Sequence, residues 1–219
     1  MRQNTIEQIL AHKIIVIVRG VDREKLIPLA EAMYAGGIRL MELTYDASGK
    51  TPDAETAENI RMLAKHFAGR MFIGAGTVLD THQVELTKAA GGLFIISPDT
   101  HPEVIRHTVE CGLVSIPGAL TPTEMQAAHR AGADFIKVFP ASEFSLSYLK
   151  AVMAPLSHLR YLAVGGVTDE NIKEYLDAGV LGFGIGSAIV NKKYIADGSW
   201  DAVTGMAKRY TSQLPEVQA

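Results

Sequence analysis

One unit repeats from end to end of this chain: a short run of β-branched and other apolar residues, followed by a segment with helical periodicity. Short apolar runs bounded by turn residues are typical of buried strands. The segments between them carry apolar residues at helical spacing, which indicates helices with one buried face. In residues 22–37 that face is formed by Leu26, Leu29, Ala30 and Met33. The predicted strands are residues 14–18, 38–44, 71–76, 93–97, 113–118, 134–139, 159–166 and 181–187.

Eight strands alternating with helices, without a linker rich in Pro or Ser, predict a single domain. We expect an α/β (β/α)8 TIM barrel over residues 1–219, with a short helix before the first strand. Thr121 and Glu124 form a capping-box pattern, and Thr100 with Glu103 forms a looser one. The alternative is a doubly wound open sheet, whose dinucleotide fingerprint would need glycine where this chain has Leu79.

Composition narrows the class of protein. The 21 Lys and Arg and the 24 Asp and Glu give a net charge of −3 and are mixed along the sequence, which argues against nucleic acid or an anionic membrane as partner. Cys111 is the only cysteine, and the seven histidines lack zinc-site pairs, so we expect no metal site. No apolar stretch resembles a signal peptide or approaches the ~20 residues of a membrane span. We expect a cytoplasmic protein.

A lysine and a glutamate interrupt two of the predicted strands. In DFIKVF, Lys137 shares a face with Phe135 and Phe139, opposite two aliphatic residues. Because helices cover the outside of a barrel, the aliphatic face packs outward and Lys137 points into the barrel near the C-terminal strand ends, where barrels carry catalytic groups. By the same alternation, Glu42 of IRLMELT points inward and is the acidic counterpart of Lys137.

A desolvated lysine has a lowered pKa, and its neutral amine can add to a ketone to form a Schiff base. A carboxyl group in the same dry site is a suitable base, because its own pKa rises toward neutrality. The alternative is that Lys137 and Glu42 form a buried ion pair that only fixes the barrel interior.

These residues lie within motifs that resemble a known family. The motifs are GGIRLMELT, IGAGTV, ISP, IPGALTPTE, IKVFPAS, VGGV and GIGSA, in the family's order and at close to its spacing. From KIIVIVRG to GIGSAIV the chain resembles the 2-keto-3-deoxy-6-phosphogluconate aldolases, a family that includes 4-hydroxy-2-oxoglutarate aldolases and a phosphogalactonate branch. The resemblance implies a class I aldolase, without metal or other cofactor, that cleaves a 2-oxo-4-hydroxy acid, phosphorylated or not, to pyruvate and an aldehyde. It also implies a homotrimer.

The resemblance assigns residue roles. It implies that Lys137 forms the Schiff base, that Glu42 is the general acid and base, and that Thr77 contacts the pyruvyl carboxylate. Pro98 and Phe139 match the family's pocket walls. From the residues alone, Thr77 fits a helix cap equally well and Pro98 a turn.

The glycine-rich turns after the last two strands suit a distal phosphate or carboxylate, because backbone N–H groups bind anions there in many barrels. The candidate contacts are Gly165, Gly166, Gly186 and Ser187. The alternative is that glycine is present for backbone reasons only.

The chain departs from the family pattern in the loop after the second strand. Asp46 stands where many members carry an arginine for the substrate carboxylate, and the loop looks longer than usual. The phosphogalactonate branch uses an arginine after strand one, which matches Arg19; the alternative is a salt bridge at the rim.

Three other functions stay open. Two are enzymes: an oxaloacetate decarboxylase, which uses the same enolate chemistry, and a sugar-phosphate epimerase on a phosphate-binding barrel. The third is a non-catalytic barrel that binds a keto acid.

Overall fold

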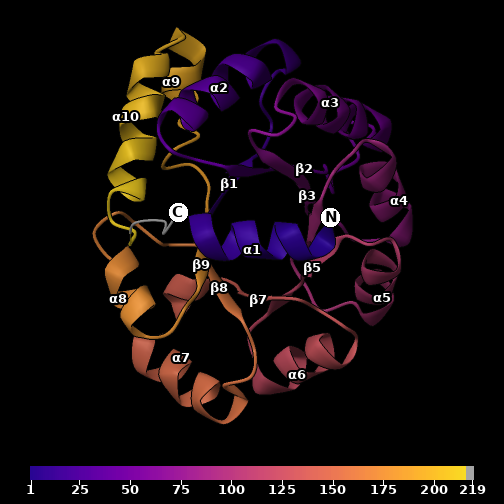
Figure 1. Cartoon of the computed structure of the whole chain (residues 1–219), viewed down its shortest axis with the longest axis vertical. Helices are drawn as coiled ribbons and strands as arrows, with labels where there is room; N and C mark the ends of the chain where they lie inside the picture. Colours follow the sequence, from indigo (N-terminus) through magenta and orange to yellow (C-terminus); the bar gives the residue numbers. More distant parts are fainter. Residues whose placement is uncertain (216–219) are drawn as a thin grey trace.

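The structure, a computed structural model, describes residues 1–215. Within them nine parallel strands form one sheet in the order β5-β4-β3-β2-β1-β9-β8-β7-β6, surrounded by helices (Figure 1). The strands are β1 Ile14–Val18, β2 Leu40–Thr44, β3 Phe72–Gly76, β4 Phe94–Ile96, β5 Val114–Ile116, β6 Gly118–Ala119, β7 Ile136–Val138, β8 Tyr161–Val164 and β9 Gly182–Ile185. The α-helices are α1 Arg2–His12, α2 Arg23–Ala35, α3 Asp53–His66, α4 Thr81–Ala89, α5 Pro102–Glu110, α6 Pro122–Arg130, α7 Leu146–Met153, α8 Ile172–Asp177, α9 Lys192–Asp197 and α10 Trp200–Thr211, and the 3-10 helices are η1 Ala141–Glu143 and η2 Ala154–Leu156.

Pro117 divides the fifth predicted strand into β5 and β6. β5 pairs with β4, and β6 pairs with β7. Proline has no N–H to donate to a strand ladder, but its carbonyl still accepts a hydrogen bond from the Lys137 backbone N–H at 2.9 Å. The Ser115 carbonyl likewise accepts from the N–H of Asp134, so the fifth strand bonds to both neighbours. The expected (β/α)8 barrel is therefore confirmed, and the open sheet is excluded.

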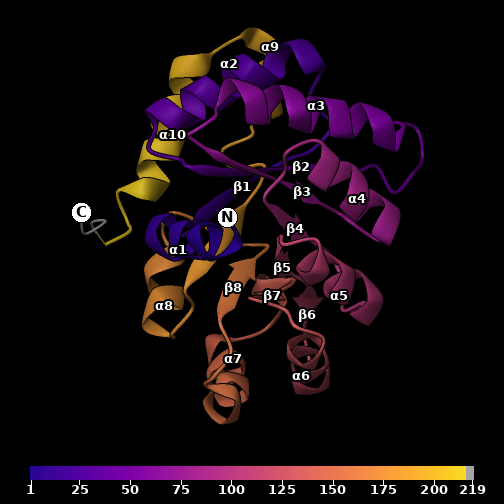
Figure 2. The ribbon, with the colours of Figure 1, turned by 45° about the vertical axis from the view of Figure 1, so that its right-hand side comes forward.

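The N-terminal helix α1 lies across one end of the barrel (Figures 1 and 2). Its Ile6 and Ile9 pack against a cluster of inward-facing residues, which includes Phe94 and Phe135. A second, larger apolar cluster fills the space between the strands and the outer helices. Because aliphatic and aromatic side chains fill the barrel at the α1 end, a substrate can reach the interior only from the C-terminal ends of the strands.

The local signals at helix starts were partly correct. Thr121 and Glu124 form the predicted capping box at α6. The looser pattern was wrong: His101 caps α5 through its ring nitrogen, and the Thr100 hydroxyl instead donates to the Gly118 carbonyl at 2.7 Å. The Thr100 hydroxyl thus bonds to β6 and does not cap α5.

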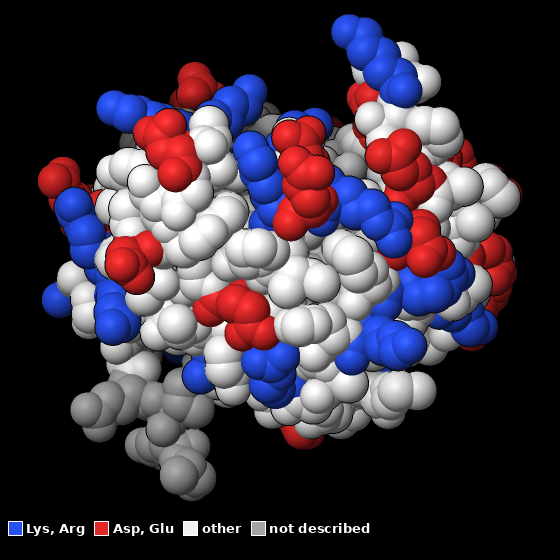
Figure 3. All heavy atoms as spheres, turned by 90° about the horizontal axis from the view of Figure 1, so that it is seen from above, with Lys and Arg blue, Asp and Glu red and all other residues white. Residues whose placement is uncertain are grey.

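On the face drawn in Figure 3, basic and acidic side chains alternate with uncharged ones, as expected from the mixed charges of the sequence. Among residues 1–215, no helix is long and apolar enough to cross a membrane.

Candidate active site

Lys137 lies in the middle of β7 and is 7% exposed. Its neighbour Phe135 belongs to the cluster inside the barrel, whereas Ile136 and Val138 belong to the outer cluster, so the strand alternates as its sequence predicts. The amine Nζ lies 4.5 Å from the centroid of the Phe139 ring and 3.4 Å from the Ser97 carbonyl oxygen. Burial lowers the pKa of Lys137, although the Glu42 carboxylate opposes this shift and the Arg19 cation adds to it. The amine therefore releases its proton more readily than a surface lysine.

Glu42 lies on β2, is 2% exposed, and lies on the same face of the strand as Leu40, which belongs to the cluster inside the barrel. Burial raises its pKa from 4.5 to about 7, against the influence of the Lys137 and Arg19 cations. Its Oε2 is buried and has no hydrogen-bond partner among residues 1–215. Gly76 makes room for this carboxyl group, because a Cβ at that position would collide with it. A buried oxygen without a partner is costly to retain in a fold, so it indicates a group kept free for a ligand.

Lys137 and Glu42 interact without touching. In the described part of the chain, no ion pair of up to 4.0 Å joins Lys137 to Glu42. Each of the two residues nevertheless changes the pKa of the other. A direct buried ion pair, the alternative considered for the sequence, is therefore not what the structure shows. The two groups are close enough for each to affect the pKa of the other, but more than 4.0 Å apart.

Arg19 and Thr77 meet at the rim above these residues. Arg19 Nη2 donates to Thr77 Oγ1 at 3.0 Å, although 58 residues separate them in the sequence. Thr77 has a left-handed backbone with φ of 56°, which is strained for a β-branched residue and typical of functional sites. Thr77 does not cap α4, because Asp80 does so by accepting from the N–H of Gln83. Arg19 is also close enough to influence the pKa of both Glu42 and Lys137.

Pro98 and Phe139 follow β4 and β7 on the same rim. Pro98 is partly buried, and its backbone lies so close to Gly118 that a Cβ there would collide with it. Phe139 is 40% exposed and turns one face toward the Lys137 amine. Neither residue lines the cavities described below, so their role as pocket walls stays a prediction.

The four residues predicted to bind a distal anion fall into two groups. Gly186 and Ser187 line a cavity of about 750 Å³ that also contains Arg19 and two lysines, Lys25 and Lys192. Gly165 and Gly166 do not line it. Both have positive φ, and a Cβ on Gly166 would collide with Ser142, so the backbone explanation applies to them directly.

Asp46 organises the loop after β2. Its carboxylate accepts hydrogen bonds from the Ser48 N–H and hydroxyl and from the Thr51 N–H, at 2.6 to 3.0 Å. These bonds lower its pKa to about 2. The loop borders a second cavity, of about 440 Å³, which also contains Arg19. The sequence could have indicated this role, since Asp followed two residues later by Ser is a common turn pattern.

A parallel barrel with an amine and a protonatable carboxyl group in its interior, and an arginine at the rim, defines a class of enzymes that bind keto acids through a lysine. Comparison with known proteins gives the family. The KDPG and KHG aldolase family model matches residues 6–206, and the chain belongs to this family.

Individual relatives agree with this assignment. A 2-dehydro-3-deoxy-6-phosphogalactonate aldolase of Escherichia coli is 37% identical over 175 residues, which is 80% of this chain and 82% of the relative. A native KDPGal structure is 33% identical, covers 91% of this chain and 93% of its own, and has a TM-score of 0.82. A Legionella pneumophila KDPG aldolase, with pyruvate captured as a covalent carbinolamine, is 29% identical, covers 93% and 96%, and has a TM-score of 0.83.

The predicted enzyme class is thereby confirmed. The family consists of class I aldolases, lyases that use a lysine Schiff base and cleave 2-keto-3-deoxy sugar acids to pyruvate and an aldehyde. The epimerase and the non-catalytic barrel are no longer needed to explain this chain.

Proposed function

We propose that this chain cleaves a phosphorylated 2-keto-3-deoxy sugar acid of the galactonate type, with Lys137 as nucleophile and Glu42 as the group that moves protons. The observation that carries the proposal is the buried Glu42 carboxyl, whose Oε2 has no partner in the described residues and whose pKa is affected by the desolvated Lys137 amine. A structural ion pair would leave neither group free.

The reaction follows from these two groups. The neutral Lys137 amine attacks the keto carbon of the substrate, and loss of water gives an iminium, which withdraws electrons from the neighbouring carbon. The Glu42 carboxylate then takes the proton from the substrate hydroxyl, the adjacent carbon–carbon bond breaks, and the aldehyde leaves. Protonated Glu42 returns the proton to the enamine carbon, and water releases pyruvate from Lys137. A pKa of about 7 suits a group that both accepts and donates a proton near neutrality.

Arg19 and Thr77 bind the carboxylate next to the keto group in this proposal. Arg19 already donates to Thr77, and its remaining N–H groups are available to a carboxylate. Asp46 does not perform this task, since its oxygens are used within its own loop. Sequence identity also supports the galactonate branch, because the E. coli relative named for that branch is 37% identical to this chain.

The distal phosphate would enter the cavity of about 750 Å³, where Gly186 and Ser187 lie beside Lys25 and Lys192. The two lysines supply the positive charge that a phosphate needs, since Arg19 is assigned to the carboxylate. Asp22 also lines this cavity and lowers its net positive charge. Gly165 and Gly166 remain part of the proposal as backbone donors at the edge of the site.

We also propose a homotrimer, which sedimentation velocity would measure.

The test is reductive trapping with pyruvate and borohydride, followed by mass spectrometry. We expect one adduct on Lys137, pyruvate release from the phosphorylated keto-deoxy-galactonate, and neither in Lys137→Ala. Lys150→Ala, which removes another lysine, is the matched control and should behave as the parent. An adduct on a different lysine would overturn the assignment. Cleavage of oxaloacetate alone, without aldehyde release from any hydroxy-keto acid, would indicate the decarboxylase instead.

A further inference from the structure

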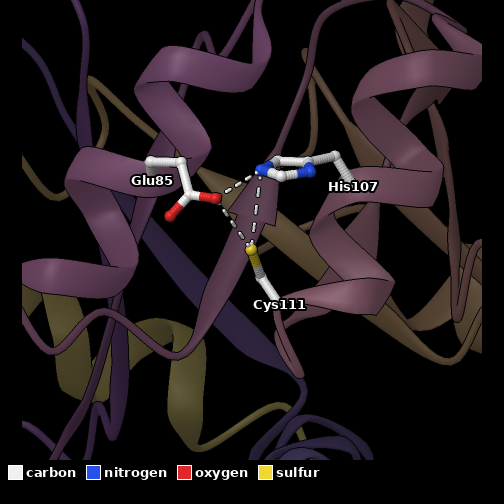
Figure 4. A group of neighbouring side chains, drawn as sticks. All are labelled: Glu85, His107 and Cys111. Carbon is white, nitrogen blue, oxygen red and sulfur yellow. Dashed lines mark hydrogen bonds and ion pairs between the residues drawn. The ribbon is translucent and has the colours of Figure 1, made fainter.

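A group of three side chains with different chemistry lies on the outside of the barrel, where α4 and α5 pack together (Figure 4). Glu85 projects from α4, His107 from α5, and Cys111 from the residue that ends α5. His107 and Cys111 are four residues apart and so lie on one helix face, one turn from each other. The barrel chemistry described above uses none of these residues.

Two of the three distances between the ligand atoms match those of a metal site. Cys111 Sγ lies 3.6 Å from Glu85 Oε1 and 3.7 Å from His107 Nε2, and Glu85 Oε1 lies 2.7 Å from His107 Nε2. Tetrahedral Zn²⁺ with bonds of about 2.3 Å to sulfur and about 2.0 Å to nitrogen or oxygen separates its ligand atoms by roughly 3.3 to 3.6 Å. The two sulfur distances therefore need almost no change, and only the Glu85–His107 hydrogen bond must open.

The surroundings also suit a metal-bound histidine. Glu110 Oε2 lies 3.8 Å from the other ring nitrogen of His107, Nδ1, which is too long for a hydrogen bond but on the side where metal-bound histidines commonly have a carboxylate partner. Burial and the Glu85 carboxylate raise the pKa of the Cys111 thiol, and the nearby Lys88 cation opposes this shift. Among residues 1–215, no other set of three such side chains comes this close together.

From this geometry we propose that Glu85, His107 and Cys111 bind one zinc-like transition metal ion on the outside of the barrel, with water as the fourth ligand. A thiolate, an imidazole and a carboxylate favour Zn²⁺ over Mg²⁺ or Ca²⁺, which prefer oxygen ligands. When the metal binds, the thiol proton passes to solvent and the Sγ–metal bond replaces the Sγ–H bond. The ion links α4 to α5 and stabilises the folded state without taking part in catalysis.

The experiment titrates the metal-free full chain with Zn²⁺ alone, and separately with Co²⁺, whose thiolate complex has a characteristic charge-transfer absorption. We expect one ion per chain, the thiolate–cobalt band, and a higher melting temperature with Zn²⁺. Cys111→Ser and Glu85→Gln should weaken binding at least about 100-fold, more than the loss of an outer-shell partner. His66→Gln is the matched control, because His66 contacts Glu31 at the same 2.7 Å but has no nearby thiol.

Aldolase activity should be the same with and without Zn²⁺, which separates this site from the barrel chemistry. Equal Zn²⁺ affinity in the parent and in Cys111→Ser, or Co²⁺ binding without a thiolate band, would overturn the proposal. Glu85 is exposed, so its variant provides a test even if Cys111→Ser folds poorly.

Discussion

The unusual pKa of Glu42 has a consequence for stability that a single substitution can measure. In the unfolded chain this carboxyl group titrates at its ordinary value of 4.5, whereas in the folded chain its pKa is about 7. Between these two values the folded protein holds a proton that the unfolded protein has released. Stability from Glu42 is thus fully present below pH 4.5 and is lost as the pH rises to about 7.

The size of the effect follows from the same numbers. Each pKa unit is worth about 1.4 kcal/mol, so a rise from 4.5 to about 7 corresponds to a loss of about 3 kcal/mol of unfolding free energy by pH 8. Glu42→Gln has no proton to lose. We therefore expect the free energy of unfolding of Glu42→Gln, relative to that of the parent, to be about 3 kcal/mol larger at pH 8 than at pH 4.5.

Urea unfolding at a series of pH values, at one fixed protein concentration, measures this difference. Any constant cost of the buried amide cancels, because only the change with pH is compared. Repeating the pair in a Lys137→Met background removes the cation that lowers the pKa of Glu42, so the pH dependence should increase there. Glu170→Gln, a surface substitution, should follow the parent at every pH. Parallel curves for Glu42→Gln and the parent would refute the reasoning.

Three further substitutions test the site. Gly76→Ala places a methyl group against the Glu42 carboxyl, so we expect at least about tenfold lower kcat in the aldolase assay and a stability loss of about 1 to 3 kcal/mol; a fully active variant would contradict the packing. Thr77→Gly relieves the backbone strain, so thermal unfolding should show unchanged or slightly higher stability. It also removes the Arg19 contact, so KM for the keto acid should rise, and an unchanged KM would count against the carboxylate site. Asp46→Ala removes three hydrogen bonds from its loop, so hydrogen exchange of residues 46–51 should accelerate. Equal protection of these residues in the parent and the variant would contradict this role of Asp46.

The positions of Lys137 and Glu42 could be predicted from local pattern because a strand has a period of two. Once a run of residues is known to be a strand covered by helices on one face, its inward positions are fixed, and both residues fell on them. The split of the fifth strand could not be predicted in the same way. Pro117 suggests an interruption, but only the neighbouring strands show that its carbonyl still bonds to Lys137.

The distal site shows where local pattern stops being sufficient. Gly165 and Gly186 look alike in sequence, as glycines in turns after strands, yet only Gly186 lines the cavity that contains Lys25 and Lys192. The sequence likewise offered no reason to join Glu85 to His107, because 22 residues and one strand separate them.

The sequence by itself determined the alternation of strands and helices, the inward direction of Lys137 and Glu42, and the motifs that carry the aldolase resemblance. Each of these depends on periodicity or on residue order, which are properties of short segments. Only the tertiary structure decided that Lys137 and Glu42 stay apart and that Arg19 reaches Thr77. Those facts depend on distances between segments far apart in the chain, and burial and charge change a pKa only through such distances.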